Sequence, residues 1–198
     1  MTPPYRAQWE SAELVAEFLA GRDPASDPRW VASGAGSVDE YASWAEHLCG
    51  CACLQMALGA RGRAVPAMHA VRRGVQALGG YVEEPGGAIR GLIYAGAIAW
   101  LEGQGIAARI VLDLDATGIP ALLGEGGVFI ASVHPAIRDA AAEPPSRGGH
   151  LVLVFGVAAD GALRFHNPSG DSTATREDAR LQPAEFCRFF AGRGILIG

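Results

Sequence analysis

The spacing of apolar residues divides the chain into two halves. Up to residue 104 the apolar side chains recur every three or four positions, the pattern of helices that bury one face. From residue 106 onward, short runs of β-branched and other apolar residues replace this spacing, as in buried strands. The pattern predicts helices over residues 7–20, 38–47, 49–60, 67–78 and 89–104, and strands over residues 106–112, 127–134, 151–157, 162–166 and 194–197.

Helices in the first half and strands in the second predict an α+β fold in two packed layers. Within the second half, Asp160-Gly161 is a hairpin signal between two strands. Short helices are expected over residues 117–123 and 183–190. The stretches 135–149 and 167–175 are rich in small and polar residues and are expected to be loops.

The helix predicted over residues 49–60 differs from the others because it is apolar on nearly every side. Gln55 is its one strongly polar residue. A helix of this kind is expected to be central and buried. The helix before it has a clear start, with Ser37 as the N-cap and Glu40 three positions later as its capping-box partner.

The first 36 residues are expected to form an extension, and residues 37–198 the main domain. The extension combines the helix over residues 7–20 with a loop over residues 23–36 that contains prolines and glycines. Its expected role is to pack against the main domain. Control of substrate entry is the alternative.

The composition fits a protein with a large core. The chain has 198 residues, of which 49% are apolar and 19% charged, and this excludes intrinsic disorder. A net charge of −5 and scattered arginines give no basic surface for nucleic acid. The apolar runs 91–101 and 151–159 fall well short of the roughly 20 residues that span a bilayer. The N-terminus lacks the apolar core of a secretion signal, so we expect a cytoplasmic protein with no membrane partner.

Three of the four cysteines, Cys49, Cys51 and Cys53, alternate with other residues in one short stretch. Cysteines this close together cannot join distant segments, and a chain of this size needs no disulfides. His47 lies beside them, but spacing by twos differs from the Cys-x-x-Cys of structural zinc sites. We therefore expect no metal site, and chemistry or packing as the role of these thiols.

Cys49 is the candidate nucleophile because it begins the apolar helix. A thiol attacks a carbonyl as the thiolate, and a helix N-terminus and a nearby imidazolium both lower its pKa. The free amide of Cys49 would donate to an oxyanion. Gly50 would let a substrate carbonyl approach the helix start. Cys53, one turn further on, is expected in the core.

His150 and Asn167 are the candidate partners of this thiol. His150 follows Gly148 and Gly149, which leave space for a substrate, and begins the most apolar strand. Asn167 follows the strand expected to pair with it. A hairpin would bring both residues to one end of the sheet, where the Asn side chain would orient the imidazole. His166 would point to the opposite face and serve packing.

Three motifs in this order resemble the peptidase domain of bacteriocin-processing, double-glycine-leader proteases, a papain-like family. The motifs are Cys49-Gly50-x-Ala52-Cys53-Leu54-x-Met56, the stretch from Gly149 to Val157, and His166-Asn167-Pro168-Ser169-Gly170. The resemblance covers roughly residues 37–198. It implies a papain-like fold, with a helical half packed on an antiparallel sheet and the active site in the cleft between them. It also implies Cys49 as nucleophile, His150 as general base, Asn167 as the third member and no cofactor.

The chain departs from the family pattern in two ways. The family has a glutamine six positions before the nucleophile that completes the oxyanion hole, whereas this chain has Ser43, with Trp44 beside it. Losing one such donor costs about 100- to 1,000-fold in rate. Ser43, Trp44 and Gly149 are the candidate oxyanion or substrate contacts, and His47 is an alternative donor. A transporter part usually follows such a domain in the family, whereas we expect this chain to be a stand-alone version.

These residues support three functions. The first is a cysteine peptidase that cleaves a peptide or another amide through a thioester on Cys49. The second is a related acyltransferase or cyclase in a biosynthetic pathway, in which an amine resolves the same thioester. The third is a catalytically silent domain that binds a peptide, which the missing glutamine and the Asn at position 167 would fit. The expected partner is therefore a peptide or acyl substrate.

Overall fold

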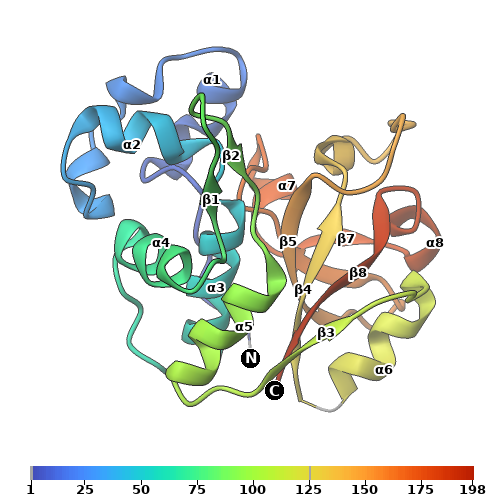
Figure 1. Cartoon of the computed structure of the whole chain (residues 1–198). Helices are drawn as coiled ribbons and strands as arrows, with labels where there is room; N and C mark the ends of the chain where they lie inside the picture. Colours follow the sequence, from blue (N-terminus) through green and yellow to red (C-terminus); the bar gives the residue numbers. More distant parts are fainter. Residues whose placement is uncertain (1, 125) are drawn as a thin grey trace.

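The computed structural model describes residues 2–124 and 126–198. Figure 1 shows two layers side by side, with the helices of the first half on one side and a sheet on the other. The predicted α+β architecture is confirmed. The helical layer contains α1 (Val15–Leu19), α2 (Val38–Ala45), α3 (Cys49–Ala60), α4 (Met68–Ala77) and α5 (Tyr94–Gly103).

Six antiparallel strands form the sheet in the order β3-β8-β4-β5-β6-β7. The last strand of the chain is therefore inserted between two earlier ones, which ties the C-terminal end into the middle of the sheet. The two central strands, β4 and β5, are buried along most of their length. The strands are β3 (Ala108–Val111), β4 (Val128–Val133), β5 (His150–Val157), β6 (Leu163–His166), β7 (Ala179–Leu181) and β8 (Phe190–Ile197).

The helix α3 occupies the centre of the molecule, as its apolar sequence predicts. It has the predicted bounds, and its residues from Gly50 to Leu58 are buried. It packs against β5 and β4 on one side and α4 on the other. Burying apolar surface on all sides stabilises this helix by roughly 25 cal/mol per Å² of apolar area, so its position and its N-terminus are firmly fixed.

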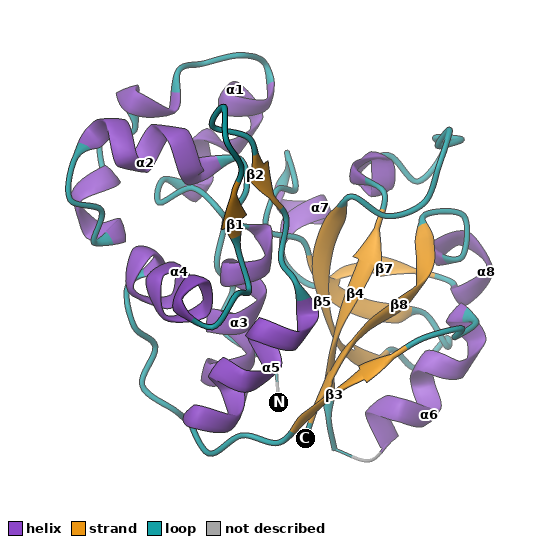
Figure 2. Cartoon of the chain, in the orientation of Figure 1, coloured by secondary structure: helices purple, strands orange, loops and turns teal. Residues whose placement is uncertain are grey.

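The opposite face of the sheet has a second core, which contains Phe129, Phe165, Phe186 and Phe190 in tilted and edge-to-face contacts. Figure 2 shows α6 and α8 on this side of the sheet. The helices on this side and near the site are short: α6 (Ile119–Gly124), α7 (Thr173–Arg176) and α8 (Pro183–Phe186). Single 3-10 turns lie at Ala12–Leu14, Pro24–Ser26, Trp30–Ser33, Ala116–Gly118 and Pro135–Arg138. No helix of the described chain is long and apolar enough to cross a membrane.

The helix predicted over residues 7–20 is wrong in its first half. Helical structure begins only at Ala12, because the chain before it is held elsewhere. The Gln8 amide donates to the Pro168 carbonyl at 3.0 Å, and Ser11 Oγ donates to Asp27 at 2.6 Å. These contacts anchor the extension to the sheet side and to its own following loop.

The helix predicted over residues 89–104 also begins too early. Ile89–Arg90 forms strand β2, which pairs with β1 (Val82–Glu83) in a small hairpin, and α5 starts at Tyr94. The Ile93 amide donates to the Gly80 carbonyl at 2.8 Å, so residues 91–93 run as an extended connection. The loop predicted over 167–175 and the helix over 183–190 are likewise corrected, since α7 begins at residue 173 and β8 already begins at Phe190.

Candidate active site

Cys49 is the first residue of α3 and is half-buried. No side chain caps this helix start, so the first backbone amides remain without intrahelical acceptors. The amides of Leu151, Gly50 and Cys49 itself lie close enough to the sulfur to favour its thiolate form. The nucleophile expected from the sequence therefore lies at the positive end of the central helix, against the start of β5.

His150 is the first residue of β5 and is buried. Two glycines precede it, Gly148 at φ +91° and Gly149 at φ +93°. Residues that carry a side chain rarely adopt such φ angles. Glycine is therefore required here to turn the chain into the strand. Gly149 and His150 both line the cavity described below. The space expected in front of His150 is thus provided by backbone conformation as well as by missing side chains.

Asn167 directly follows β6, and its side chain contacts the imidazole. His150 Nε2 lies 2.8 Å from Asn167 Oδ1. The Ser169 amide donates to the same oxygen at 3.1 Å, which fixes that atom as an acceptor. His150 Nε2 therefore carries the proton, and Nδ1 is left as the basic nitrogen. The pairing of β5 with β6 brings the two residues together, as the hairpin in the sequence predicts.

Two residues that the sequence interpretation did not single out support this pair. Arg138 donates through Nε to the Ser169 carbonyl at 2.5 Å and through Nη2 to Ser169 Oγ at 2.6 Å. Ser169 Oγ in turn lies 3.1 Å from His150 Nε2. Ser169 belongs to the His-Asn-Pro-Ser-Gly motif, which was a signal for it. Arg138 lies in a stretch predicted to be a loop, and its sequence offered no signal.

Burial controls the protonation of the candidate pair. It lowers the pKa of the His150 imidazole to about 4, although the Asn167 contact raises this pKa and the Arg138 charge lowers it further. Burial also raises the pKa of the Cys49 thiol, against the opposing effect of the nearby amides and of Arg138. The lowered thiol pKa expected from the helix start is therefore wrong for the free protein, because desolvation outweighs the helix terminus. Both groups are neutral at pH 7.

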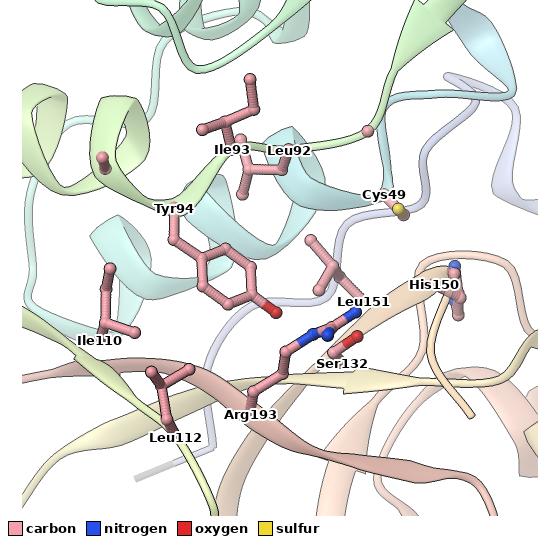
Figure 3. A pocket seen from close by; sticks show the side chains of 13 residues that line it. Cys49, Leu92, Ile93, Tyr94, Ile110, Leu112, Ser132, His150, Leu151 and Arg193 are labelled. Atoms are coloured by element: carbon pink, nitrogen blue, oxygen red, sulfur yellow. The ribbon is translucent and has the colours of Figure 1, made fainter.

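A cavity of about 590 Å³ separates the helical layer from the sheet at this point. Cys49 and His150 lie at one end of it (Figure 3), and Gly149 is also part of its lining. Residues 91–95 form one wall, and Ile110, Leu112, Ser132 and Arg193 come from the sheet side. No hydrogen bond joins the Cys49 sulfur to the His150 ring within the described residues, but both groups are reached from the same cavity. A substrate in the cavity would contact both.

The structure places two other candidate contacts elsewhere. Ser43 is exposed on α2, where its Oγ donates to the Glu40 carbonyl at 3.0 Å. Trp44 is buried, with the Arg72 guanidinium 4.4 Å from its ring centroid. Neither Ser43 nor Trp44 is among the described residues that line the cavity. His47 is half-buried, and its carbonyl accepts from the Tyr81 hydroxyl at 3.3 Å.

Gly50 has a packing role that differs from the expected one. A Cβ atom at this position would lie 2.8 Å from Leu92 Cβ and 2.9 Å from the Tyr81 hydroxyl. Both distances are too short for real contacts, so glycine is required for Leu92 to close over the helix start. The expectation that Gly50 opens a path for a substrate carbonyl is wrong, because Leu92 occupies that space.

The remaining cysteines are free thiols away from this chemistry. Cys51 and Cys53 are buried in the core, and Cys51 Sγ lies 3.6 Å from the Tyr81 hydroxyl. Cys187 is half-buried on the other side of the sheet. Within the described residues, no group of three or more His, Cys, Asp and Glu side chains could hold a metal ion.

Comparison with known proteins identifies the fold. No protein-family model matches the chain, and no curated protein matches it in sequence. A solved structure matches, the peptidase domain of Streptococcus ComA, which is described as a bi-functional ABC transporter involved in a quorum sensing pathway. The match covers 77% of this chain and 92% of that one, with a TM-score of 0.53 and 17% sequence identity. The chain has a papain-like fold.

The papain-like fold explains why residues so far apart in sequence meet. Its helical half presents the start of α3, and its sheet half presents the ends of β5 and β6. At 17% identity the likeness concerns the arrangement of helices and strands alone. The chemistry has to be argued from the residues of this chain.

Proposed function

We propose that the chain is a cysteine peptidase-like enzyme that cleaves a peptide or another amide through a thioester on Cys49. The observation that carries this proposal is the contact of His150 Nε2 with Asn167 Oδ1. It leaves Nδ1 as the base beside a cavity that Cys49 also lines. The likeness of the fold to a peptidase domain supports the same reading.

In the proposed reaction, a substrate carbonyl enters the cavity next to the Cys49 sulfur. His150 Nδ1 accepts the thiol proton as the sulfur attacks the carbonyl carbon. The negative charge on the carbonyl oxygen is stabilised by the free amides at the start of α3. The imidazolium then gives its proton to the departing amine, which leaves a thioester. Water, deprotonated by His150, hydrolyses the thioester and restores the thiol.

A neutral thiol and a neutral imidazole are compatible with this sequence of steps. The proton moves while the sulfur is attacking, so the negative charge passes to the carbonyl oxygen and need not remain on a buried sulfur. Asn167 holds the ring in one orientation throughout, because its oxygen accepts from Nε2–H in both protonation states of the ring. With Ser43 away from the cavity, the helix amides are the donors that we propose for the oxyanion. This loss of one donor would slow turnover by about 100- to 1,000-fold.

Acyl transfer is the second candidate, and the character of the cavity favours it. Its walls are largely apolar, with Leu92, Ile93, Ile110, Leu112 and Leu151. An apolar cavity would slow the attack of water on the thioester and lengthen its lifetime. An amine bound in the cavity would then compete with water, as in an acyltransferase or cyclase.

The test is a burst assay with p-nitrophenyl esters of N-acetylated amino acids, which need no knowledge of the natural substrate. We expect one p-nitrophenolate per protein in a rapid burst, and an added mass on Cys49 in the intact protein. Cys49→Ala and His150→Ala should both abolish the burst. Cys187→Ala is the matched control, because it removes a half-buried thiol outside the cavity. A burst that survives Cys49→Ala would refute Cys49 as the nucleophile, and absence of any burst in the unmodified protein would leave the peptide-binding function.

Products of the same reaction distinguish the two enzymatic candidates. With a peptide mixture alone, a hydrolase releases free carboxylic acids. With added hydroxylamine or a primary amine, a transferase forms the corresponding hydroxamate or amide faster than the acid. The ratio of these products, measured by mass spectrometry, assigns the acceptor.

A further inference from the structure

Arg193 lines the largely apolar cavity from the sheet side and is exposed to solvent. Arg193 extends from β8 toward Ser132, and the Tyr94 hydroxyl points at its guanidinium (Figure 3). A Cβ atom on Gly148 would lie 3.5 Å from Arg193 Nη2 and 3.3 Å from Ser132 Oγ. The guanidinium and the Ser132 hydroxyl therefore both lie close to Gly148, in the loop that leads to His150.

Among the residues that the structure describes, no carboxylate balances this charge. Within the described residues Arg193 forms no ion pair, whereas Arg164 is paired with Asp178 and Arg188 with Glu143. The neighbours of Arg193 in the cavity are hydroxyl groups and apolar side chains. A guanidinium binds a carboxylate through charge-assisted hydrogen bonds, and the apolar walls on one side of Arg193 screen this attraction less than water on every side would.

The three polar groups form a set of donors. Ser132 is buried in the middle of β4, where its hydroxyl is within hydrogen-bond reach of the Tyr94 phenol. Burial raises the pKa of the Tyr94 phenol, and the nearby Ser132 hydroxyl and Arg193 partly oppose this, so Tyr94 remains a protonated donor at neutral pH. One guanidinium and two hydroxyls suit a planar anion with a single charge. A carboxylate meets this description, whereas a phosphate dianion would leave one charge unbalanced.

We propose that Arg193, with Tyr94 and Ser132, binds a carboxylate of the substrate, joined by a short apolar segment to the carbonyl that Cys49 attacks. This inference rests on the proposed function for the position of the reacting carbonyl. The carboxylate comes from an Asp or Glu side chain of a peptide or from its free C-terminus. Both sources present the same group to the guanidinium, and the experiment separates them.

The binding experiment uses Cys49→Ala protein, so that it does not depend on turnover. Its probes are N-acetylated hexapeptide mixtures that carry Glu, Gln or Lys at each position in turn, with a free or an amidated C-terminus. We expect the Glu mixtures, or the free C-termini, to bind about 10- to 100-fold more tightly than their neutral counterparts. A preference for Glu identifies the side chain as the source, and a preference for the free terminus identifies the α-carboxylate.

Substitutions connect this preference to Arg193. Arg193→Gln should remove the discrimination between charged and neutral probes, and Arg193→Glu should reverse it toward Lys. A reversed preference cannot result from misfolding. Arg109→Gln is the matched control, because Arg109 is exposed on the neighbouring strand β3 and lies outside the cavity lining. Equal binding of Glu and Gln probes by the Cys49→Ala protein, or discrimination that survives Arg193→Gln, would overturn the proposal.

The two proposals fail separately. Absence of an acylation burst in the unmodified protein, together with carboxylate binding in the Cys49→Ala protein, would refute the chemistry and retain the carboxylate site. A burst with no difference between charged and neutral substrates would retain the chemistry and refute the site.

Discussion

His150 Nε2 and Asn167 Oδ1 lie 2.8 Å apart at the end of the β5–β6 pair. The Ser169 amide donates to the same Asn167 oxygen, and Arg138 holds Ser169 through two hydrogen bonds. The imidazole is therefore oriented by a chain of contacts from two other segments of the sequence, residues 167–169 and the segment that contains Arg138. Each contact in this chain has a different expected effect on the proposed reaction.

Substitution of Asn167 tests the orienting contact. Asn167→Ala removes the acceptor for Nε2–H, and we expect kcat to fall about 10- to 100-fold, less than the roughly 100- to 10,000-fold expected from losing the general base in His150→Ala. Asn167→Asp keeps an oxygen acceptor and should retain more activity than Asn167→Ala. The measurement is steady-state ester hydrolysis of purified variants. If Asn167→Ala were as inactive as Cys49→Ala, the carboxamide would have a direct part in the chemistry.

Arg138 tests the electrostatic part of the site. Its charge lowers both the thiol pKa of Cys49 and the imidazole pKa of His150. In Arg138→Met both pKa values should rise, so the thiolate should form at higher pH than in the unmodified protein. The readout is the pH profile of Cys49 alkylation, which a purely structural role would leave unchanged. Arg138→Lys, which keeps the charge but loses the two-pronged contact with Ser169, should restore the profile without restoring all of kcat.

The sequence predicts those parts of the site that neighbouring residues in the chain mark. The apolar run of α3 gives its bounds, and the two glycines before His150 mark a strand entry. Arg138 and Arg193 carry no such signal. Arg138 acts on Ser169, 31 positions away, and Arg193 reaches the cavity only because β8 inserts between β3 and β4. Roles of this kind depend on long-range pairing, which periodicity does not contain.

The predicted start of α5 is wrong for the same reason, because a long-range contact sets where this helix begins. Leu92 and Ile93 keep the helical spacing of the residues after them, so the pattern extends the helix backward to residue 89. The helix begins only at Tyr94 because the Ile93 amide donates to the Gly80 carbonyl and the residues before it form the β1–β2 hairpin. As a result, Leu92 and Ile93 line the cavity instead of the face of a helix.

The protonation state of Cys49 gives a prediction about its reactivity. Because burial raises the thiol pKa, the thiolate fraction at a given pH should be lower than that of an ordinary thiol. The rate of alkylation by iodoacetamide should therefore be low at pH 5–6 and rise through an apparent pKa above about 8.5. Mass-spectrometric mapping measures this rate for Cys49 in a Cys187→Ser background. A plateau of fast alkylation that extends to pH 5 would instead show a preformed thiolate–imidazolium pair.

Gly50 couples the stability of the fold to the shape of the cavity. An alanine Cβ would lie 2.8 Å from Leu92 Cβ, and this overpacking should destabilise the protein by about 1–3 kcal/mol, despite the better helix propensity of alanine. Urea unfolding measures the change. Gly103→Ala is the matched control, since Gly103 is also helical but has nothing within 4 Å of its added Cβ, and it should be neutral or stabilising by about 0.5–1 kcal/mol.

The same substitution should also act on the proposed reaction. If Leu92 moves to relieve the contact, it moves relative to the Cys49 end of the cavity that both residues line. Gly50→Ala should therefore raise KM for bulky acyl esters more than for acetyl esters, while Gly103→Ala leaves both unchanged. Equal stability of the two variants, together with equal KM values, would mean that the helix start tolerates a side chain and that Leu92 does not shape the cavity.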